Sequence, residues 1–336
     1  MNKYLITGFS GFVGRHFVEY LDSKDKNCLV KGLDIQNPDF RLAQYKNVQI
    51  SFEKLDLLSK HQVEYIIHEF QPNYILHLAS YSSVAYSWKE PVQSFMNNTN
   101  IFLNLIDAVR KLNIDSRILS IGSSEEYGNV NDEDLPLKED HKINPLSPYA
   151  VARMSQELLS KVYTDGYGMD IVLTRSFNNI GPRQKDVFVV SSIAKQLVEI
   201  KKSGGKKGSI VTGAVSIVRD FTDVRDVVSA YYLLLKEGKT GHVYNICSGI
   251  GLSIKDIIDI MAEQLNIEVD INIDNRLIRP ADNKRIIGSN EKIKRELGWQ
   301  NNIPLEQSLR DIIFYWEANS HAESDIGSTE NDGNNL

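Results

Sequence analysis

The chain has little of what marks a disulfide scaffold or a metal centre. Its 336 residues include two cysteines, Cys28 and Cys247, which stand far apart and form no C-x-x-C spacing. The seven histidines include no pair four residues apart. From these absences we expect no disulfide framework and no metal site, and a reducing compartment such as the cytoplasm.

An excess of positive charge and long apolar runs are also missing. Lys and Arg total 38 against 44 Asp and Glu, a net charge of −6, so the chain as a whole does not attract a nucleic-acid backbone. No stretch approaches the roughly 18 consecutive apolar residues of a membrane span. A glycine follows within the first eight residues, before a signal-peptide core could form. We therefore expect no nucleic-acid partner, no membrane span and no export.

The chain does have a regular alternation of short apolar segments and amphipathic segments. The pattern predicts strands at 3–7, 29–34, 48–52, 74–79, 117–122 and 171–175, and helices at 12–21, 63–70, 92–112 and 148–167. Strands separated by helical crossovers of this length form a parallel sheet with both faces covered. The sequence therefore predicts an α/β protein with a Rossmann-type doubly wound parallel sheet.

A glycine-rich loop lies between the first predicted strand and the first helix, and it consists of Gly8, Phe9, Ser10, Gly11, Phe12, Val13 and Gly14. Glycines at such a turn let the backbone approach a pyrophosphate, which then lies at the helix N-terminus. The second strand ends at Asp34, whose carboxylate can accept hydrogen bonds from ribose hydroxyls and would repel a 2′-phosphate. We therefore expect a dinucleotide cofactor, with NAD(H) favoured over NADP(H). Asp56 suits an adenine contact and a helix cap equally well.

The regular alternation of predicted strands and helices becomes irregular after about residue 177. We assign residues 1–176 to a dinucleotide-binding Rossmann domain, to which later segments can return. Residues 177–318 are assigned mainly to a smaller mixed α/β substrate-binding lobe. Residues 319–336 are polar and acidic with almost no apolar side chains, so we expect a disordered tail there.

A second group of residues suits proton transfer. Ser123 follows the predicted strand 117–122 at its carboxyl end, where open parallel sheets place ligands. Tyr149 and Arg153 lie four residues apart on one face of the next predicted helix. A cation one turn away stabilises a phenolate, and a serine hydroxyl can hydrogen-bond a carbonyl oxygen. The three residues predict a site for interconversion of C=O and CH–OH, although a Tyr and an Arg at this spacing are by themselves more often a helix-surface pair.

Several motifs together resemble the extended short-chain dehydrogenase/reductases that act on nucleotide sugars. They are TGFSGFVG at 7–14, HLAS at 77–80, IGSSEEYG at 121–128, SPYAVAR at 147–153, RSFNNIGP at 175–182 and VRDFTDVRD at 218–226. The resemblance covers about residues 3–316. More narrowly, IGSSEEYG, FTDVRDVV, VYNICSGIG and IGSNEKIK are similar to segments of bacterial GDP-4-dehydro-6-deoxy-D-mannose reductases, which form GDP-D-rhamnose.

This resemblance implies roles for the residues that match the family motifs. The implied catalytic residues are Ser123, Tyr149, Arg153 and Glu125. Cofactor contacts are implied for the glycine loop and for Asp34, Asp56, Leu57, Leu78, Ala79, Ser80, Tyr149 and Arg153. Substrate contacts are implied for Ser83, Ser124, Asn178, Arg219 and Arg279. The two arginines suit a diphosphate because guanidinium groups bind phosphate oxygens in pairs, but a surface or interdomain salt bridge is nearly as common a role.

The resemblance also implies an activity: NAD(P)H-dependent reduction of the 4-keto group of a GDP-linked 4-keto-6-deoxyhexose. It implies a homodimer that pairs through helices 92–112 and 148–167. Two alternatives stay open. One is a lyase of the GDP-mannose 4,6-dehydratase type, or another nucleotide-sugar epimerase or dehydratase. The other is a catalytically silent dinucleotide-binding protein. Glu125 does not decide between reductase and dehydratase, because both kinds of enzyme retain a glutamate there.

One position departs from the family pattern Tyr-x-x-x-Lys, since Arg153 stands where lysine is expected. Arginine keeps the positive charge. Its planar guanidinium is not a compact point donor, so the contact that lysine makes with the cofactor ribose can be displaced. This departure is the feature that supports the silent alternative.

Overall fold

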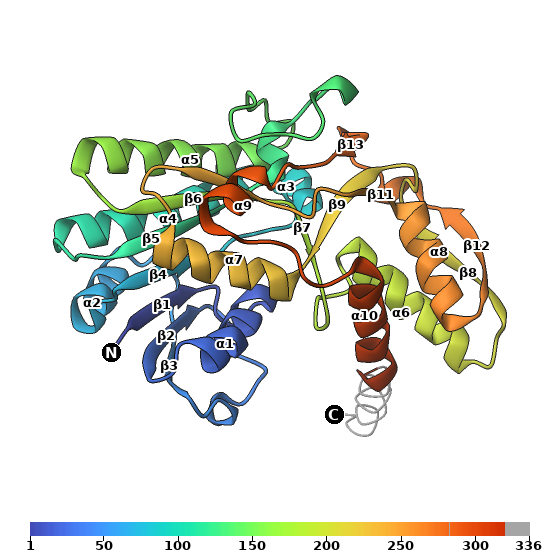
Figure 1. Cartoon of the computed structure of the whole chain (residues 1–336), viewed down its shortest axis with the longest axis horizontal. Coiled ribbons are helices and arrows are strands. Elements are labelled where there is room, and N and C mark those ends of the chain that lie inside the picture. The colour runs from blue at the N-terminus through green and yellow to red at the C-terminus, as the bar shows by residue number, and fades with distance from the viewer. Residues whose placement is uncertain (282, 320–336) are drawn as a thin grey trace, which may run out of the picture. The chain divides into compact units, whose positions relative to one another are not determined.

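A seven-stranded parallel sheet forms the middle of the first of two units (Figure 1). The computed structural model describes residues 1–281 and 283–319. The strands of the sheet are β1 Lys3–Thr7, β2 Cys28–Asp34, β3 Val48–Lys54, β4 Tyr74–His77, β5 Arg117–Ser123, β6 Ile171–Ser176 and β10 Val243–Ile246. Their order is β10-β6-β5-β4-β1-β2-β3, and all neighbours are parallel. The chain winds outward in both directions from β1, which confirms the predicted Rossmann-type fold.

Helices cover both faces of this sheet. One face carries α1 (Phe12–Lys24) and α7 (Val224–Glu237), and the other carries α2 (Lys60–Phe70), α4 (Pro91–Lys111) and α5 (Pro148–Tyr167). Neighbouring residues of β1 point to opposite faces, so Tyr4 and Ile6 join the core on the α1 side while Leu5 joins the core on the α2 side. Burial on both faces explains why the strands read as nearly continuous apolar runs.

The helix α5 has clear start and stop signals in the sequence. The hydroxyl of Ser147 accepts a hydrogen bond from the Ala150 N–H at 3.1 Å, and Pro148 occupies the first turn. Gly168 ends the helix with a φ of +68°, a conformation that favours glycine. These local signals place Tyr149 in the first turn of α5.

Two later stretches return to the first unit, residues 219–251 and 280–302. They contain α7, β10 and α9 (Glu291–Leu297). Asp226 of α7 fastens the second stretch, because its carbonyl oxygen accepts the Trp299 indole N–H at 3.1 Å and its carboxylate accepts the Asn302 N–H at 3.0 Å. A second sheet has the order β11-β9-β13 with β7 paired to β9, and its strands are β7 Asn178–Ile180, β9 Val218–Asp223, β11 Gly251–Ser253 and β13 Arg285–Ile286.

The second unit comprises residues 180–218, 252–279 and 303–319 of the described chain. Its elements are α6 Val189–Lys202, β8 Lys207–Thr212, α8 Ile254–Leu265, β12 Glu268–Ile273 and α10 Leu305–Asn319. The three helices pack on one another, and β8 pairs in parallel with β12. Ser253 and Asp256 form a reciprocal capping box at the start of α8. Asn319, where the predicted tail begins, is the last residue of α10, and the rest of that tail lies outside the described residues.

Short 3-10 turns and one short helix complete the described elements. The turns are η1 Leu42–Gln44, η2 Ser124–Tyr127, η3 Asp132–Asp134 and η4 Asn275–Leu277, and the helix is α3 Val84–Lys89. Within residues 1–281 and 283–319, no helix is long and apolar enough to cross a membrane. In the same part of the chain, no group of three or more His, Cys, Asp and Glu side chains could hold a metal ion.

Candidate active site

The loop between β1 and α1 passes close to its neighbours. Gly8 has a φ of +68°, and a Cβ there would lie 2.7 Å from the Ala79 nitrogen. A Cβ at Gly14 would lie 2.5 Å from the Phe9 carbonyl oxygen. Gly11 is the N-cap of α1 and brings no side chain to the first-turn N–H groups, which leaves these donors for an anion. The loop therefore fits the pyrophosphate of a dinucleotide.

Asp34, the last residue of β2, forms a hydrogen bond with this loop through its carboxylate. Its Oδ2 accepts the Ser10 N–H and its Oδ1 accepts the Gln36 N–H, each at 3.0 Å. Ser10 Oγ donates in turn to the Gln36 carbonyl oxygen at 2.7 Å. Phe12 and Val13 open α1 and pack against the adjacent core. Both oxygens of the Asp34 carboxylate therefore already accept backbone donors.

A pocket lies where β2 and β3 end, and it is lined by Ile35, Lys54, Leu55, Asp56 and Gln62. Asp56 also accepts the Leu58 N–H at 2.9 Å, just before α2. Leu57 is buried, and its carbonyl oxygen accepts the Asn104 amide at 2.9 Å. Asp56 thus serves the turn before α2 and also faces a pocket where an adenine could lie.

The residues after β4 meet the glycine loop. The Leu78 N–H donates to the Thr7 carbonyl oxygen at 3.1 Å, and the Ala79 N–H donates to Thr7 Oγ1 at 3.3 Å. Ser80 follows with its hydroxyl buried. Ser83 lies further along, where it caps α3 by accepting the Tyr86 N–H at 3.1 Å.

His77, at the end of β4, is fully buried beside this loop. Its Nδ1 lies 2.9 Å from Thr7 Oγ1. Burial, and then the charge of Arg153, lower the pKa of His77 to about 3. The ring is therefore neutral at physiological pH.

Ser123, Tyr149 and Arg153 belong to neighbouring elements, since α5 packs on β5 and on η2. Arg153 Nε donates to Tyr149 Oη at 3.1 Å, and the guanidinium carbon lies 5.3 Å from the centre of the tyrosine ring. Ser123 ends β5, and its Oγ accepts the Glu125 N–H at 3.2 Å. All three side chains are largely buried. The structure thus brings together the tyrosine and the cation and places both on the helix that covers the Ser123 strand.

Arg153 also reaches the strand beneath it. Its Nη1 donates to the Ile121 carbonyl oxygen at 2.9 Å and to Gln156 Oε1 at 2.8 Å. Gln156 Nε2 donates to Ser120 Oγ at 2.9 Å. The guanidinium therefore joins the phenol of Tyr149 to the strand that ends at Ser123.

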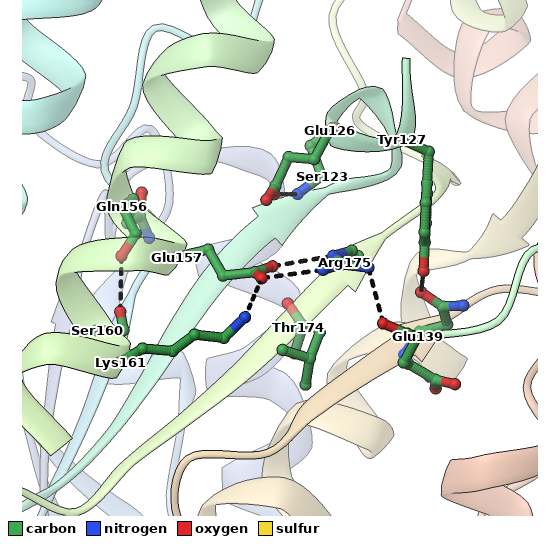
Figure 2. A network of polar contacts seen from close by, with 12 residues as sticks. Ser123, Glu126, Tyr127, Glu139, Gln156, Glu157, Ser160, Lys161, Thr174 and Arg175 are labelled. Carbon is green, nitrogen blue, oxygen red and sulfur yellow. Dashed lines mark hydrogen bonds and ion pairs between the residues drawn. The ribbon is translucent and has the colours of Figure 1, made fainter. Parts of the chain in front are cut away.

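A buried ion pair fastens α5 to β6 nearby (Figure 2). Arg175 Nε and Nη2 donate to the two oxygens of Glu157, each at 2.9 Å, and Lys161 Nζ lies 2.7 Å from the same carboxylate. Burial opposes charge on Glu157, but hydrogen bonds from Arg175 and Lys161 hold the pKa of this carboxyl below its usual range. Arg175 and Glu157 are 18 residues apart in the chain, and no local pattern in the sequence indicates the pair.

The turn η2 carries Ser124, Glu125 and Glu126. Ser124 is buried, and Glu125 is partly exposed. Glu126 is fully buried, and its Oε1 accepts the Ser123 N–H at 2.7 Å. From the sequence we selected Glu125 rather than Glu126, although Ser123 and Glu126 have the spacing of a capping box, which the structure forms.

Asn178 and Arg219 are held by backbone contacts. Asn178 Nδ2 donates to the Asp220 carbonyl oxygen at 3.2 Å, and Arg219 Nη1 donates to the Asn283 carbonyl oxygen at 2.8 Å. The buried carboxylate of Asp220 accepts hydrogen bonds from Ser248 N, Ser248 Oγ, Gly249 N and Gly288 N. Burial raises the pKa of Asp220 to about 6. Arg279 lies at the end of a segment of the second unit.

The doubly wound sheet, the glycine loop and the residues Ser123, Tyr149 and Arg153 define an extended short-chain dehydrogenase/reductase. A model of the family described as GDP-mannose 4,6 dehydratase matches residues 5–312, and the chain belongs to this family.

Two curated relatives match over nearly the full chain. The chain is 32% identical to the GDP-6-deoxy-D-mannose reductase of Pseudomonas aeruginosa, over 96% of this chain and 99% of the relative. It is 26% identical to a GDP-mannose 4,6-dehydratase of Vibrio cholerae, over 96% of each.

Solved structures agree with this family. The Pseudomonas aeruginosa enzyme RMD, complexed with NADPH, superposes with a TM-score of 0.81 and 31% identity over 95% of this chain and 99% of that one. The UDP-glucose 4-epimerase of Thermus thermophilus, complexed with NAD, gives a TM-score of 0.81 and 28% identity over 94% of this chain and 99% of that one.

The predicted preference for NAD(H) is wrong. The Pseudomonas aeruginosa structure contains NADPH, which points to NADP(H) instead. The prediction assumed that the Asp34 carboxylate is turned toward a ribose. In the structure one oxygen of the Asp34 carboxylate accepts the Ser10 N–H and the other accepts the Gln36 N–H, so the carboxylate also holds the loop. An aspartate at this position is therefore not a sufficient sign of NAD(H).

Proposed function

We propose that this protein reduces the 4-keto group of a GDP-linked 4-keto-6-deoxyhexose, forms GDP-D-rhamnose, and uses NADPH as the reductant. The observation that carries the proposal is the similarity to GDP-6-deoxy-D-mannose reductase over almost the whole of both chains. The contacts of Tyr149, Arg153 and Ser123 support the same chemistry from within this chain.

Tyr149 is the proton donor in this proposal. Reduced nicotinamide, when bound, supplies a hydride to the carbonyl carbon. The carbonyl oxygen then needs a proton, which the Tyr149 hydroxyl gives. Arg153 Nε, 3.1 Å from the phenol oxygen, stabilises the negative charge that remains there. Ser123 Oγ accepts the Glu125 N–H and directs its own hydrogen to the carbonyl oxygen.

The remaining site residues bind the two nucleotides. The glycine loop, Asp34, Asp56, Leu57 and the segment 78–80 hold the cofactor in our proposal. Arg219 and Arg279 hold the diphosphate of the sugar nucleotide, because guanidinium groups bind phosphate oxygens in pairs and the chain is acidic overall. Ser83, Ser124 and Asn178 contact the sugar or its phosphates.

The decisive experiment compares two substrates with the purified protein. With NADPH and GDP-4-keto-6-deoxymannose, we expect one NADPH oxidised for each sugar that gains two hydrogens, as measured by absorbance and mass spectrometry. With GDP-mannose alone we expect no reaction. Tight NADPH binding without turnover of any keto sugar would support the silent alternative instead.

A dehydratase is the second candidate, supported by the similarity to a GDP-mannose 4,6-dehydratase, and Glu125 would be its base. This acid stands two residues after Ser123, in η2, where a base could remove the proton beside a 4-keto group. A dehydratase would convert GDP-mannose to a product that has lost one water, with no net consumption of NADPH. The same mass spectrum therefore separates the two activities.

We propose a homodimer formed through α4 and α5, with a second copy of this chain as the partner. These helices pack side by side and expose apolar side chains to solvent, namely Val92, Phe95, Met96, Val151, Leu158, Val162 and Tyr167. Exposed apolar patches of this kind mark interaction surfaces.

We also propose that the enzyme is located in the cytoplasm. Both cysteines are free and buried, as a reducing compartment allows.

A further inference from the structure

Glu126 is a buried acid next to the site that the mechanism above does not use. It lies in η2, directly after the strand that ends at Ser123, and its side chain is fully buried. The turn packs against α5 and against β6. A glutamate in such a place is unusual, because a carboxylate that is buried without partners for both oxygens destabilises the folded state.

The Glu126 carboxyl interacts with the backbone of Ser123. Its Oε1 accepts the Ser123 N–H at 2.7 Å, as Figure 2 shows, while its Oε2 is buried without a hydrogen-bond partner among the described residues. Gly122 makes room for this contact, because a Cβ there would lie 2.5 Å from Glu126 Oε1 and 2.4 Å from the Thr174 carbonyl oxygen. The side chain thus satisfies the last N–H of β5.

The surroundings of Glu126 favour its neutral form. Glu157 and Arg153 face it from α5, Arg175 faces it from β6, and the Ser123 N–H faces it from β5. Arg175 is already engaged in two hydrogen bonds with Glu157. Burial and then the negative charge of Glu157 raise the pKa of Glu126 to about 8, against smaller effects of the Ser123 N–H and the two arginines. A neutral acid also leaves no unpaired charge on the isolated Oε2.

We propose that Glu126 is a positioning residue for Ser123: its buried Oε1 accepts the Ser123 N–H and fixes the backbone from which the Ser123 hydroxyl meets the substrate carbonyl. This proposal rests on the proposed reductase function. Ionisation strengthens the bond from the Ser123 N–H but places a second negative charge near Glu157 in the core. In our proposal the repulsion between the two carboxylates moves the Glu126 side chain and, with it, the backbone of Ser123. Turnover therefore falls as the acid loses its proton, although Glu126 touches neither substrate nor cofactor.

Two substitutions and one control separate positioning from general structural support. Glu126→Gln keeps an acceptor oxygen of the same shape and cannot ionise, and Glu126→Leu removes the acceptor at similar size. Glu133→Gln makes the same charge change at an exposed residue of η3. We expect Glu126→Leu to lower kcat about 10-fold to 100-fold with KM and NADPH affinity little changed, because misplacing a reacting group by about 1 Å can cost about 100-fold in rate.

The pH dependence is the sharper measurement. Between about pH 7 and about pH 9, we expect the ratio of kcat of Glu126→Gln to kcat of the unmodified protein to rise roughly tenfold, because only the unmodified protein loses the neutral acid. The Glu133→Gln ratio should stay constant. Parallel pH profiles of the unmodified protein and Glu126→Gln, or full turnover in Glu126→Leu, would overturn the proposal.

Urea unfolding tests the neutral acid without any substrate. The folded-state pKa of Glu126 lies above the ordinary value, so the folded protein binds more protons than the unfolded chain between the two values. We expect the urea midpoint of the unmodified protein to fall relative to Glu126→Gln as pH rises from about 5 to about 9. If the urea midpoints of the unmodified protein and Glu126→Gln change in parallel with pH, Glu126 is not a neutral acid in the folded protein, whatever the substrate is. If the unmodified protein reduces no keto sugar, both the proposed function and the positioning role of Glu126 are wrong. The urea midpoints still show whether Glu126 is neutral in the folded protein.

Discussion

At the scale of the residue, the guanidinium of Arg153 makes contacts that a lysine ammonium could not repeat. It donates to Tyr149 Oη, to the Ile121 carbonyl oxygen and to Gln156 Oε1. A planar fork reaches these acceptors at once, whereas an ammonium is a compact point donor. The departure from the family pattern therefore does not leave Tyr149 without a cationic partner.

We expect Arg153→Lys to lower turnover about tenfold, since one ammonium cannot hold both the phenol and the strand carbonyl. Steady-state kinetics with NADPH and the keto sugar would measure this, with Arg276→Lys as the control. Arg276 is an exposed arginine paired with Asp274. Higher turnover in Arg153→Lys would mean that the arginine weakens the site.

Tyr149→Phe removes the proposed proton donor and keeps the ring. We expect turnover to fall about 100-fold or more, because a positioned general acid contributes a factor of this size. NADPH affinity, measured by fluorescence titration, should stay nearly the same. Full activity in this variant would exclude the tyrosine as the acid.

At the scale of the element, the pairing of α5 with β6 depends on Glu157 and Arg175. Both side chains are buried, and the two hydrogen bonds between them satisfy charges that water would otherwise solvate. Removing one partner of such a pair leaves the other charge buried and alone.

We expect Glu157→Ala to lower the free energy of unfolding by about 3 to 5 kcal/mol. The double variant Glu157→Leu with Arg175→Met should recover much of this loss, because apolar side chains of similar size leave no unpaired charge.

The contribution of Glu157 to stability also depends on pH. Its folded-state pKa is lowered, so the stabilisation is present above the ordinary pKa of a glutamate and is lost as pH falls. Urea unfolding of the unmodified protein, Glu157→Ala and the double variant at two pH values measures these effects. Equal free energies of unfolding for all three proteins would refute the role of the ion pair.

Short elements were the part of the fold that the sequence did not reveal. The predicted strand 3–7 coincides with β1, and the predicted helix 148–167 coincides with α5. The helix α3 and the strands β7, β9, β11, β12 and β13 were not predicted. An element of a few residues is too short to show a periodic pattern of apolar side chains. Its position also depends on partners elsewhere in the chain.

At the scale of the whole molecule, the exposed apolar side chains of α4 and α5 predict the assembly. We expect the protein to elute as a dimer in size exclusion with light scattering. Met96→Glu with Val162→Glu should give a monomer, because charges would be buried without partners. Tyr65→Glu on α2 changes another exposed apolar residue outside this surface and should leave the dimer intact. A monomer in the unmodified protein would rule out the proposed interface.

The sequence alone determined what depends on neighbours along the chain. The alternation of apolar segments fixed the parallel sheet, because strand and helix periods decide which faces are buried. The glycine loop follows a strand and precedes a helix, so its place at a helix N-terminus was readable. The spacing of Tyr149 and Arg153 likewise favoured contact on one face of α5, where the structure has a 3.1 Å hydrogen bond.

Only the tertiary structure decided which distant groups meet. Periodicity shows that a face is buried but not what covers it, so the contact of Arg153 with Ile121 and the pairing of Glu157 with Arg175 were hidden. The cofactor preference was also wrong, as the NADPH in the Pseudomonas aeruginosa structure indicates. Asp34 was interpreted as an acceptor for ribose hydroxyls, and its place in the sequence did not show that the folded loop brings two backbone N–H groups to it. The capping-box spacing of Ser123 and Glu126 is a local signal, but the full burial of Glu126 depends on the packing of η2 on α5 and β6.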